Sequence, residues 1–450
     1  MSDVVIVEAV RSPVGRRKGG LSAVHSTDLL GQVQAELIRR AGIDPREVGQ
    51  VVGGCVGQVG MQTMNVARNA WLGAGLPLEV AASTVDAQCG SSQQATNLAY
   101  SLVKSGVVDV AVGCGVESMS QVPMGATIPK DPKVGVPVTR KYRQHHEWTS
   151  QFDGAERIAK QWGIERADTD AFGKLSQDRA AAAWADDRFA SQIAPIDAPA
   201  LDADRNPTDE RTTITKDEGL RATTLEALAG LRPNMEGGVH TAGTSSQISD
   251  GAGAVLMMTR EKAKALGLEP KATIVDSCLV GSDPVLMLTG PIGATQRLLA
   301  RNGLQMGDID VVEINEAFAS VVLAWEKELK PDMATVNPNG GAIALGHPLG
   351  GTGAILLTTA VHELAHVLRR RPRHRHAAAP RLVARPQSHP SPGARMPAPK
   401  ENARHELDAP PWRRVESTLM ATARAIRNAY HRRPESPGRN PSQASPIEVR

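Results

Sequence analysis

The strongest constraint on the fold is an alternation of short β-branched runs with amphipathic stretches in the first part of the chain. Runs such as Val4–Val10 and Val48–Val52 have the apolar character of strands that are buried on both faces. Thr27–Ala41 has the apolar spacing of a helix. Strands that alternate with helices usually form a parallel sheet covered by helices, so the predicted fold class is α/β. Further strands are predicted over Ser83–Ala87 and Val107–Gly113, and a further helix over Gln93–Lys104.

A second occurrence of this rhythm predicts two similar halves. The stretch AGIDPREVGQVV (Ala41–Val52) can be laid on NGLQMGDIDVVE (Asn302–Glu313) at an offset of 261 residues. The same offset carries Cys89 to position 350, inside GHPLGGTGA, which precedes a predicted helix over Ala354–Leu364. We expect two βαβ halves whose loops meet at one site. The alternative is that any two α/β stretches look alike.

The pattern divides the chain into four parts. Residues 120–238 are richer in Pro, Lys, Asp and Thr and contain two predicted long helices, Gly154–Trp162 and Asp168–Asp187, which we interpret as an inserted lid. The predicted parts are a first half over 1–119, completed by about 239–268, then the lid over 120–238, a truncated second half over 269–365, and a tail over 366–450.

The charge of the chain is distributed unevenly. From His366 onward there are 18 Lys and Arg against 6 Asp and Glu, while residues 1–365 carry a net charge of −9. An acidic body excludes a generally basic nucleic-acid binder, so we expect no nucleic-acid partner. The tail holds 13 of the 30 prolines, a composition that predicts disorder. The alternative is that the tail binds nucleic acid or an anionic membrane.

Cysteine use and the N-terminal sequence predict a cytoplasmic location. The four cysteines form no C-x-x-C pair, which is typical of a reducing compartment. The start MSDVVIVEAVRSP is acidic and strand-like, unlike a signal peptide, and no apolar run is long enough to span a membrane.

Cys89 is the first candidate for chemistry. In VDAQCGSSQQATNLA it lies between a predicted strand end and a helix start, where the helix dipole and free N–H groups favour a thiolate nucleophile. The alternative is that it is a small buried apolar residue, which fits Cys55, Cys114 and Cys278 better.

Two further candidates lie in the second half. NPNGGAIALGHPLGGTGA is a glycine-rich turn that lacks the ending of a P-loop and carries His347, either a base for a thiol or a structural residue. Asn315, in EINEAFA, follows a predicted strand and could cap a helix or orient a water or a carbonyl.

Together these motifs resemble the thiolase family, degradative or biosynthetic. CGSSQQA, HTAGTSSQISDGAGAVLMM, NEAFA and GGAIALGHPLGGTGA occur in that order and spacing, with VEAVRSPVGRRKGG and LEALAGLRP in addition. The resemblance covers residues 1 to about 364. It implies a thiolase fold with a layered α/β/α/β/α core and an inserted lid, and an acyl transfer between acyl-CoA and acetyl-CoA or its thiolytic reverse.

The resemblance also implies roles for single residues. Cys89 would be the acyl-carrying nucleophile, His347 its base and part of the oxyanion hole, and Asn315 the holder of a water. It implies no permanently bound cofactor or metal, coenzyme A and acetyl-CoA as substrates in fatty-acid, sterol or related lipid degradation, and a homodimer or homotetramer. The residues expected to contact CoA are Arg221, Ser246, Ala317 and Phe318.

The chain departs from the family at three places. The family has a second active-site cysteine in a C-x-G motif after the GHP, whereas this chain has no cysteine after Cys278. The change near Leu364–Leu368 suggests a shifted reading frame. We expect impaired C–C chemistry, because loss of a proton-transfer group typically lowers the reaction rate by about 10²–10⁴-fold.

In the lid, SQFDGAERIA (Ser150–Ala159) replaces a His-Met-Gly segment of short-chain thiolases, which favours a longer or branched acyl chain.

Two rival interpretations remain. HELAH (His362–His366) is a literal H-E-x-x-H that would hold zinc in a metallopeptidase with Glu363 as base, or is a chance match at the end of a helix. The other rival is a non-catalytic protein that keeps the scaffold and CoA binding without turnover.

Overall fold

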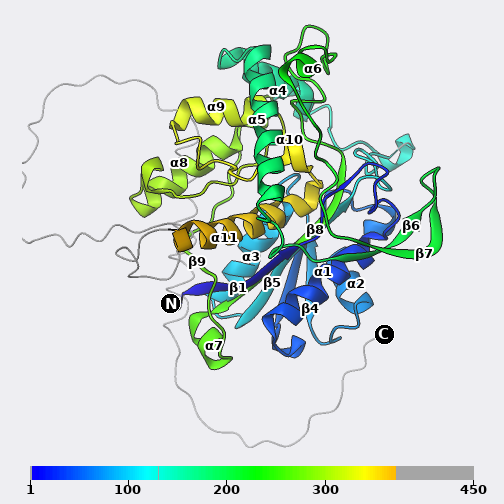
Figure 1. Cartoon of the computed structure of the whole chain (residues 1–450), viewed down its shortest axis with the longest axis vertical. Helices are drawn as coiled ribbons and strands as arrows, with labels where there is room; N and C mark the ends of the chain where they lie inside the picture. Colours follow the sequence, from blue (N-terminus) through cyan, green and yellow to red (C-terminus); the bar gives the residue numbers. More distant parts are fainter. Residues whose placement is uncertain (1–2, 130, 371–450) are drawn as a thin grey trace, which may run out of the picture. The chain divides into compact units, whose positions relative to one another are not determined.

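A mixed sheet with the strand order β4-β3-β5-β8-β1-β9, and with β2 beside β8, is the centre of the computed structural model, which describes residues 3–129 and 131–370 (Figure 1). Strand β3 is parallel to β4 and β5, as predicted, whereas β8 is antiparallel to β5 and β1. The strands are β1 Val4–Arg11, β2 Gly15–Arg16, β3 Gln50–Gly54, β4 Ala81–Val85, β5 Val110–Ser118, β8 Ser249–Thr259 and β9 Ala272–Ile274.

Strand β1 shows why the core has two sides. All eight of its residues are buried, and their side chains alternate between the faces of the sheet. Val5 and Val7 join the apolar cluster that contains helix α1, while Val4 and Ile6 join the cluster that contains helix α3. A strand buried on both faces therefore has the continuous apolar run from which it was predicted.

Helices cover both faces of this sheet. Helix α1 (Ser26–Ala41) ends at Gly42, whose left-handed φ of 67° allows the chain to leave the helix, and packs with α2 (Val66–Gly73) on one face. Helices α3 (Ser91–Lys104) and α11 (Thr352–Arg370) cover the other face and contact each other. The first three layers of the expected core are thus helix, sheet and helix.

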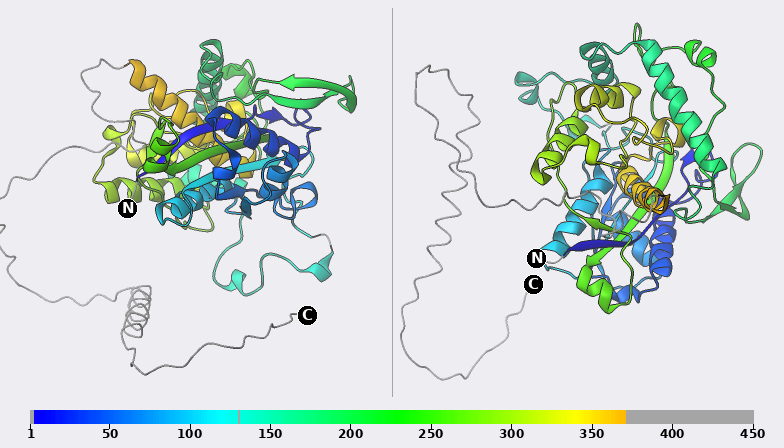
Figure 2. Two further views of the ribbon diagram at one scale, coloured as in Figure 1. Left: turned by 90° about the horizontal axis from the view of Figure 1, so that it is seen from below. Right: turned by 60° about the vertical axis from the view of Figure 1, so that its left-hand side comes forward.

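The range predicted as the lid contains its own elements. Helix α5 packs against α10 and α9, so this insertion contacts the second half of the chain. Figure 2 shows the β6–β7 hairpin extending away from the main sheet. The elements are α4 Gln151–Gln161, α5 Arg166–Ala185, β6 Ile196–Leu201, β7 Pro207–Ile214 and α6 Leu225–Ala229.

The second half is mainly helical in the part of the chain that the structure describes. The strand predicted at the end of Asn302–Glu313 is an extended segment that makes one parallel bridge, Val312 with Val336, and no named strand. The helices of this half are α8 Gly290–Asn302, α9 Ala319–Leu329 and α10 Ala342–Leu345, followed by α11, whereas α7 (Arg260–Ala265) lies in the range 239–268 of the first half.

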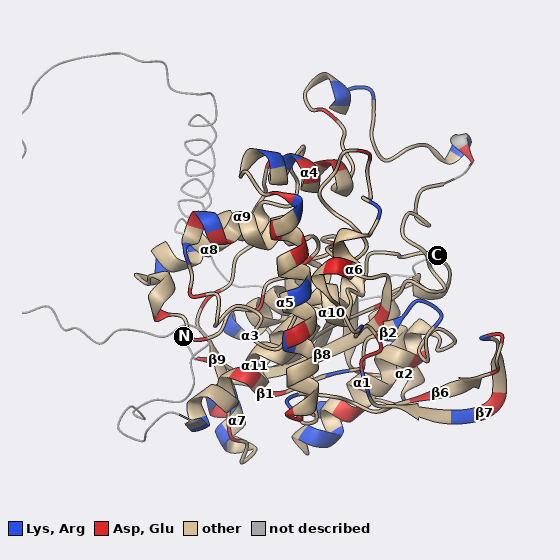
Figure 3. Cartoon of the chain, turned by 45° about the horizontal axis from the view of Figure 1, so that its top comes forward, with Lys and Arg blue, Asp and Glu red and all other residues tan. Residues whose placement is uncertain are grey.

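Several expectations concern features outside this framework. Of the tail predicted to be disordered over 366–450, residues 366–370 belong to helix α11 instead, and the rest lies outside the described residues. Within residues 3–129 and 131–370, the helices do not combine the length and apolar character that crossing a bilayer requires. Residues of both charges occur along helices α4 and α5 (Figure 3).

Candidate active site

The loop that carries His347 connects α10 to α11 and needs glycine at its first position. Gly346 has a φ of 114°, and a Cβ atom there would collide with the side chain of Ser249. The backbone N–H of His347 donates to Ser249 Oγ at 3.1 Å. The loop is therefore held against the start of β8, and His347 is buried.

The hydrogen-bond partners of His347 favour the tautomer that carries its proton on Nδ1. Its Nδ1 lies 2.6 Å from Thr352 Oγ1, and that hydroxyl donates to the carbonyl of Pro348 at 3.1 Å. Because the hydroxyl proton is used, Thr352 accepts the proton of Nδ1, which leaves the lone pair on Nε2. Burial lowers the pKa of His347 to about 4, so the ring is neutral at pH 7 and Nε2 can accept a proton.

Asn315 lies beside this ring. Its Nδ2 is 3.3 Å from His347 Nε2. Its Oδ1 is buried and has no hydrogen-bond partner among the described residues, so it can accept from a bound water or substrate. The side chain of Asn337 holds the preceding residue, because it pairs with the N–H and the carbonyl of Ile314 at 2.8 Å each.

Cys89 lies in the turn between β4 and α3, as predicted. Ser91 Oγ accepts the N–H of Ala87 at 3.0 Å and donates to the carbonyl of Gln88 at 2.6 Å, which closes the turn. Gln88 itself has a positive φ of 51°.

The thiol of Cys89 is not activated by its position alone. Burial raises its pKa to about 11, and the carboxylates of Glu117 and Asp86 act in the same direction, against a smaller opposite effect of the local backbone. The backbone at the start of the helix does lower the pKa, as expected, but desolvation outweighs this contribution in the unliganded chain.

Close contacts between glycines and backbone bring the two turns together. The N–H of Ala354 in α11 donates to Ser92 Oγ in α3 at 2.9 Å, and a Cβ atom at Gly353 would collide with the backbone of Gln93. Buried Glu117 accepts the N–H groups of Gly350 and Gly57 at 2.9 Å each. The starts of α3 and α11 therefore lie against each other. Neither ring nitrogen of His347 bonds to Cys89.

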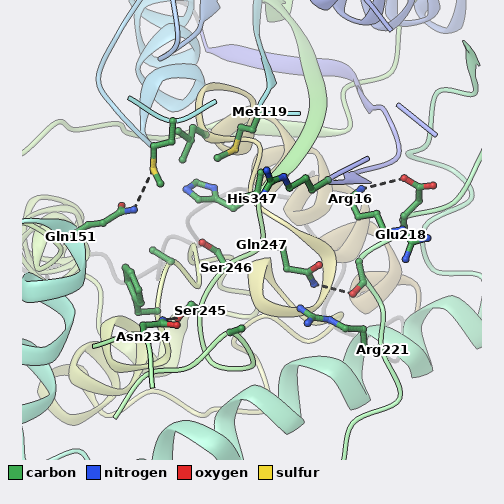
Figure 4. A pocket seen from close by; sticks show the side chains of 18 of the residues that line it. Arg16, Met119, Gln151, Glu218, Arg221, Asn234, Ser245, Ser246, Gln247 and His347 are labelled. Atoms are coloured by element: carbon green, nitrogen blue, oxygen red, sulfur yellow. Dashed lines mark hydrogen bonds between the residues drawn. The ribbon is translucent and has the colours of Figure 1, made fainter. Parts of the chain in front are cut away.

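A cavity of about 530 Å³ opens on this arrangement (Figure 4). Ser246 is held at its wall by an N–H···O bond to Ala317 at 2.9 Å, and Phe152 of the lid meets Phe318 edge to face at 5.5 Å. Cys89 and Asn315 are not among the lining residues; Asn315 lines a second cavity. The predicted residues that line the first cavity are His347, Arg221, Ser246, Ala317 and Phe318.

Three functional candidates were missed in the sequence. Arg16 and Arg17 line the same cavity as Arg221, so three arginines lie at its walls. The signal was the adjacent pair in VGRRKGG, which had no assigned role. Thr352, which orients His347, lies five residues after it in the same motif, and no spacing rule for turns of this kind predicts the contact.

The H-E-x-x-H of α11 takes part in structural contacts. His362 Nε2 bonds to the carbonyl of Ala9 at 3.0 Å, and Glu363 accepts from Asn339 at 2.7 Å and pairs with Arg188. Within the described residues, no group of three His, Cys, Asp or Glu is arranged to hold a metal ion. These contacts give the zinc interpretation no support.

Comparison with known proteins identifies the family. The profile of the thiolase N-terminal domain matches residues 4–261, and that of the thiolase C-terminal domain matches residues 268–371. The chain is 44% identical to the steroid 3-ketoacyl-CoA thiolase FadA6 of Mycobacterium tuberculosis, over 82% of this chain and 89% of that protein. It is 40% identical to the 3-ketoacyl-CoA thiolase of Bacillus subtilis, over 81% of this chain and 93% of that protein.

Solved structures agree. The acetyl-CoA acetyltransferase of Bacillus anthracis superposes with a TM-score of 0.74 at 36% identity, over 82% of this chain and 93% of that one. The fold and the site define an acyltransferase that acts on thioesters. The chain belongs to the thiolase family, and the predicted thiolase fold is confirmed.

Proposed function

We propose that this thiolase cleaves 3-ketoacyl-CoA by thiolysis, with Cys89 as nucleophile, His347 as base and Asn315 as the holder of a water. The observation that carries the proposal is the cavity that His347 shares with the residues expected to contact CoA. Asn315, whose free Oδ1 faces no protein partner in the described residues, lies 3.3 Å from the base.

In the first step, the thiol proton of Cys89 passes to Nε2 of His347 and the sulfur attacks the 3-keto carbon. The C2–C3 bond breaks, and its electron pair forms the enolate of acetyl-CoA. Its oxygen accepts hydrogen bonds from the protonated imidazole and from the water held by Asn315. The imidazolium of His347 returns to C2 the proton that it took from Cys89, which releases acetyl-CoA and leaves an acyl group on Cys89. In the second step, the thiolate of CoA attacks this acyl group, and acyl-CoA leaves as the sulfur of Cys89 is freed.

The raised pKa of Cys89 and the lowered pKa of His347 have a consequence for the first step. Transfer of the thiol proton to the imidazole is unfavourable in the unliganded chain, because burial disfavours both charged forms. We infer that bound substrate changes this balance, so that the nucleophile forms only in the complex.

CoA would contact both the uncharged and the positively charged residues that line the first cavity. The pantetheine would pass Ser246 and Phe318, while Arg16, Arg17 and Arg221 would meet phosphate groups. Residues 1–365 are acidic overall, so this part of the chain needs a local group of positive charges to bind a polyanion. The three arginines at the cavity supply such a group.

For the acyl group we propose a chain longer or bulkier than acetoacetyl, from fatty-acid or sterol degradation. Met124 and Phe152 from the lid range give the cavity apolar walls on that side. The relatives named 3-ketoacyl-CoA thiolase and steroid 3-ketoacyl-CoA thiolase support this class of substrate. We also propose a cytoplasmic homodimer or homotetramer.

The test is thiolysis of acetoacetyl-CoA and of a longer 3-ketoacyl-CoA by the full chain, compared with Cys89→Ala and with Cys278→Ala as the matched control. We expect faster thiolysis of the longer substrate, loss of turnover in Cys89→Ala and retention in Cys278→Ala. Mass spectrometry of the quenched reaction should find the acyl group on the peptide that contains Cys89.

A non-catalytic CoA-binding protein is the competing function, favoured by the absence of a cysteine after Cys278. Saturable binding of CoA by calorimetry, with neither turnover nor acylation of Cys89, would replace the proposed function by this one.

A further inference from the structure

A second cavity, of about 470 Å³, is distinct from the cavity that His347 lines, and Asn315 lies at its border. Its walls are mainly apolar and come from α3, α8, α11 and two extended segments, 274–278 and 309–315. Trp325 of α9 and Ile309 are among the lining residues. An apolar space of this size between described elements calls for an occupant.

One wall of this cavity is an extended segment with a free edge. The N–H and the carbonyl of Val312 bond to Thr335 and Asn337 at 2.9 and 2.8 Å. Successive residues of an extended chain direct their backbone groups to opposite sides. The backbone groups of Val311 and Glu313 therefore point away from 335–337, and they have no hydrogen-bond partner among the residues that the structure describes.

The side chain of Glu313 adds a second unsatisfied group at the same wall. Its Oε1 is buried and has no partner in the described part of the chain. Burial raises the pKa of this carboxyl well above its usual value, with the nearby carboxyls of Glu316 and Glu363 acting in the same direction. Buried polar groups of a folded protein are normally paired, so these groups indicate a missing hydrogen-bonding partner.

The segment 274–278, which forms the opposite wall, also makes little strand pairing. Strand β9 pairs with β1 only over Ala272–Ile274. Beyond it, side chains take the backbone carbonyls: Arg301 donates to Ser277 at 3.1 Å, and Asn97 donates to Cys278 at 3.5 Å.

The first half of the chain shows what fills the corresponding space. Strand β3 has β4 on one edge and β5 on the other, both parallel. The parallel bridge of Val312 to Val336 corresponds to the pairing of β3 with β4, and α11 corresponds to α3, which leads into β5. The place that corresponds to β5 is the second cavity.

We propose that this cavity, which we call the strand slot, binds an extended apolar segment of another polypeptide as a strand parallel to 311–313. Backbone groups of the bound strand would pair with those of Val311 and Glu313, and its side chains would be buried against α3 and α11. This inference does not depend on the proposed function, because it uses none of the proposed catalytic groups as a binding partner.

The composition of the chain after Arg370 argues against an internal occupant. A strand buried on both faces needs a run of Val, Ile or Leu without proline. In residues 371–450, each Val and Ile lies within two residues of a charged residue or a proline. The segment that fits must therefore be uncharged, free of proline, and supplied by a different protein.

The probe is a synthetic peptide with blocked ends and the sequence of Val110–Val116, the uncharged part of the strand that fills the corresponding place in the first half, with serine for Cys114. We expect saturable binding to the full chain and slower hydrogen exchange at the amides of Val311 and Glu313. The same peptide with proline in place of its central residue should bind at least about 10-fold more weakly, since it lacks a ladder N–H.

Two variants on one helix locate the binding. Ala294 lines the slot and Ala300 is an exposed residue of α8 outside it. Ala294→Trp should abolish binding of the peptide, while Ala300→Trp should retain it.

Equal binding of the two peptides, or an absence of protection at Val311 and Glu313 in the unmodified chain, would overturn the proposal without any variant. So would peptide binding that appears only after removal of residues 371–450, which would make the tail the occupant. Protection that rises with protein concentration in the absence of peptide would identify a second copy instead.

Discussion

The burial of His347 has a consequence for stability as well as for catalysis. Its pKa falls from 6.5 to about 4 on folding, so the unfolded chain binds a proton that the folded chain refuses. A lowered pKa contributes stability that is present above pH 6.5 and is lost as the pH falls through 4. The contribution is on the order of 3 kcal/mol at most.

We therefore predict that acid destabilises the chain partly through this residue. Urea unfolding at pH 7 and at pH 4.5 should show a smaller loss of stability in His347→Gln than in the unmodified chain, because glutamine does not titrate. An equal loss of stability in the two chains would contradict the prediction, because it would mean that the imidazole is solvated and that folding does not lower its pKa.

Thr352 is expected to act through His347. Thr352→Val keeps the shape but removes the acceptor of the Nδ1 proton, so the tautomer with a free Nε2 is no longer favoured. We predict a fall in kcat of about 10-fold or more, with little change in KM. Thr358→Val is the matched control, because this buried hydroxyl of α11 bonds to Ala354 of its own helix at 2.8 Å. A comparable loss in the control would assign the effect to packing.

At the scale of elements, the approach of β5 to the histidine loop depends on glycine. A Cβ atom at Gly115 would collide with the carbonyl of Gly350. We predict that Gly115→Ala destabilises the chain by about 1–3 kcal/mol and lowers kcat/KM by displacing the loop. Gly73→Ala at the end of α2, where a Cβ atom meets nothing within 4 Å, should lower neither stability nor kcat/KM. Thermal unfolding and the thiolysis assay measure the two effects.

The elements that the sequence predicted well are those with a local pattern. Val4–Val10 and Thr27–Ala41 were each within one residue of the observed β1 and α1, because burial and apolar spacing repeat along the segment. The direction of β8 was not predicted, since it depends on the lid that precedes it. The predicted strand before Asn315 is extended with only one bridge, because a strand also needs a partner on its edge, and local sequence does not encode one.

The same division applies to the site. Cys89, His347 and Asn315 were found through motifs, and the two turns lie together as the repeat offset predicted. The backbone effect on the pKa of Cys89 was predicted, but the larger opposing effect of burial, with that of the carboxylates of Glu117 and Asp86, was not, because it comes from tertiary structure. Thr352 and the role of Glu117 were missed for the same reason.

For the whole molecule, electrostatics should govern the affinity for CoA. The body is acidic, so Arg16, Arg17 and Arg221 supply the positive charge at the cavity. We predict that Arg221→Ala raises KM for CoA several-fold and weakens its dependence on salt, with kcat nearly unchanged. Arg211→Ala, on the β6–β7 hairpin, is the control and should match the unmodified chain. A lowered kcat in Arg221→Ala would place this residue in the reaction instead.

Assembly is a second property of the whole molecule. Strand β4 is the outermost strand beside β3 and is only partly buried, and an open edge of this kind favours pairing with another chain. We predict a dimer or tetramer by sedimentation, and a monomer when a proline replaces Thr84 on that edge. A monomeric unmodified chain would contradict the proposed assembly.

The meeting of α3 and α11 affects how the protein is made. Cys89 leaves the ribosome more than 250 residues before His347, so the growing chain carries its nucleophile long before its base. A free thiol in a partly folded chain is exposed to oxidants and to stray thioesters. Once buried, the thiol has a pKa near 11 and is almost entirely protonated, so it reacts slowly with such compounds. The feature that makes the nucleophile depend on its substrate thus also protects the thiol once the chain has folded.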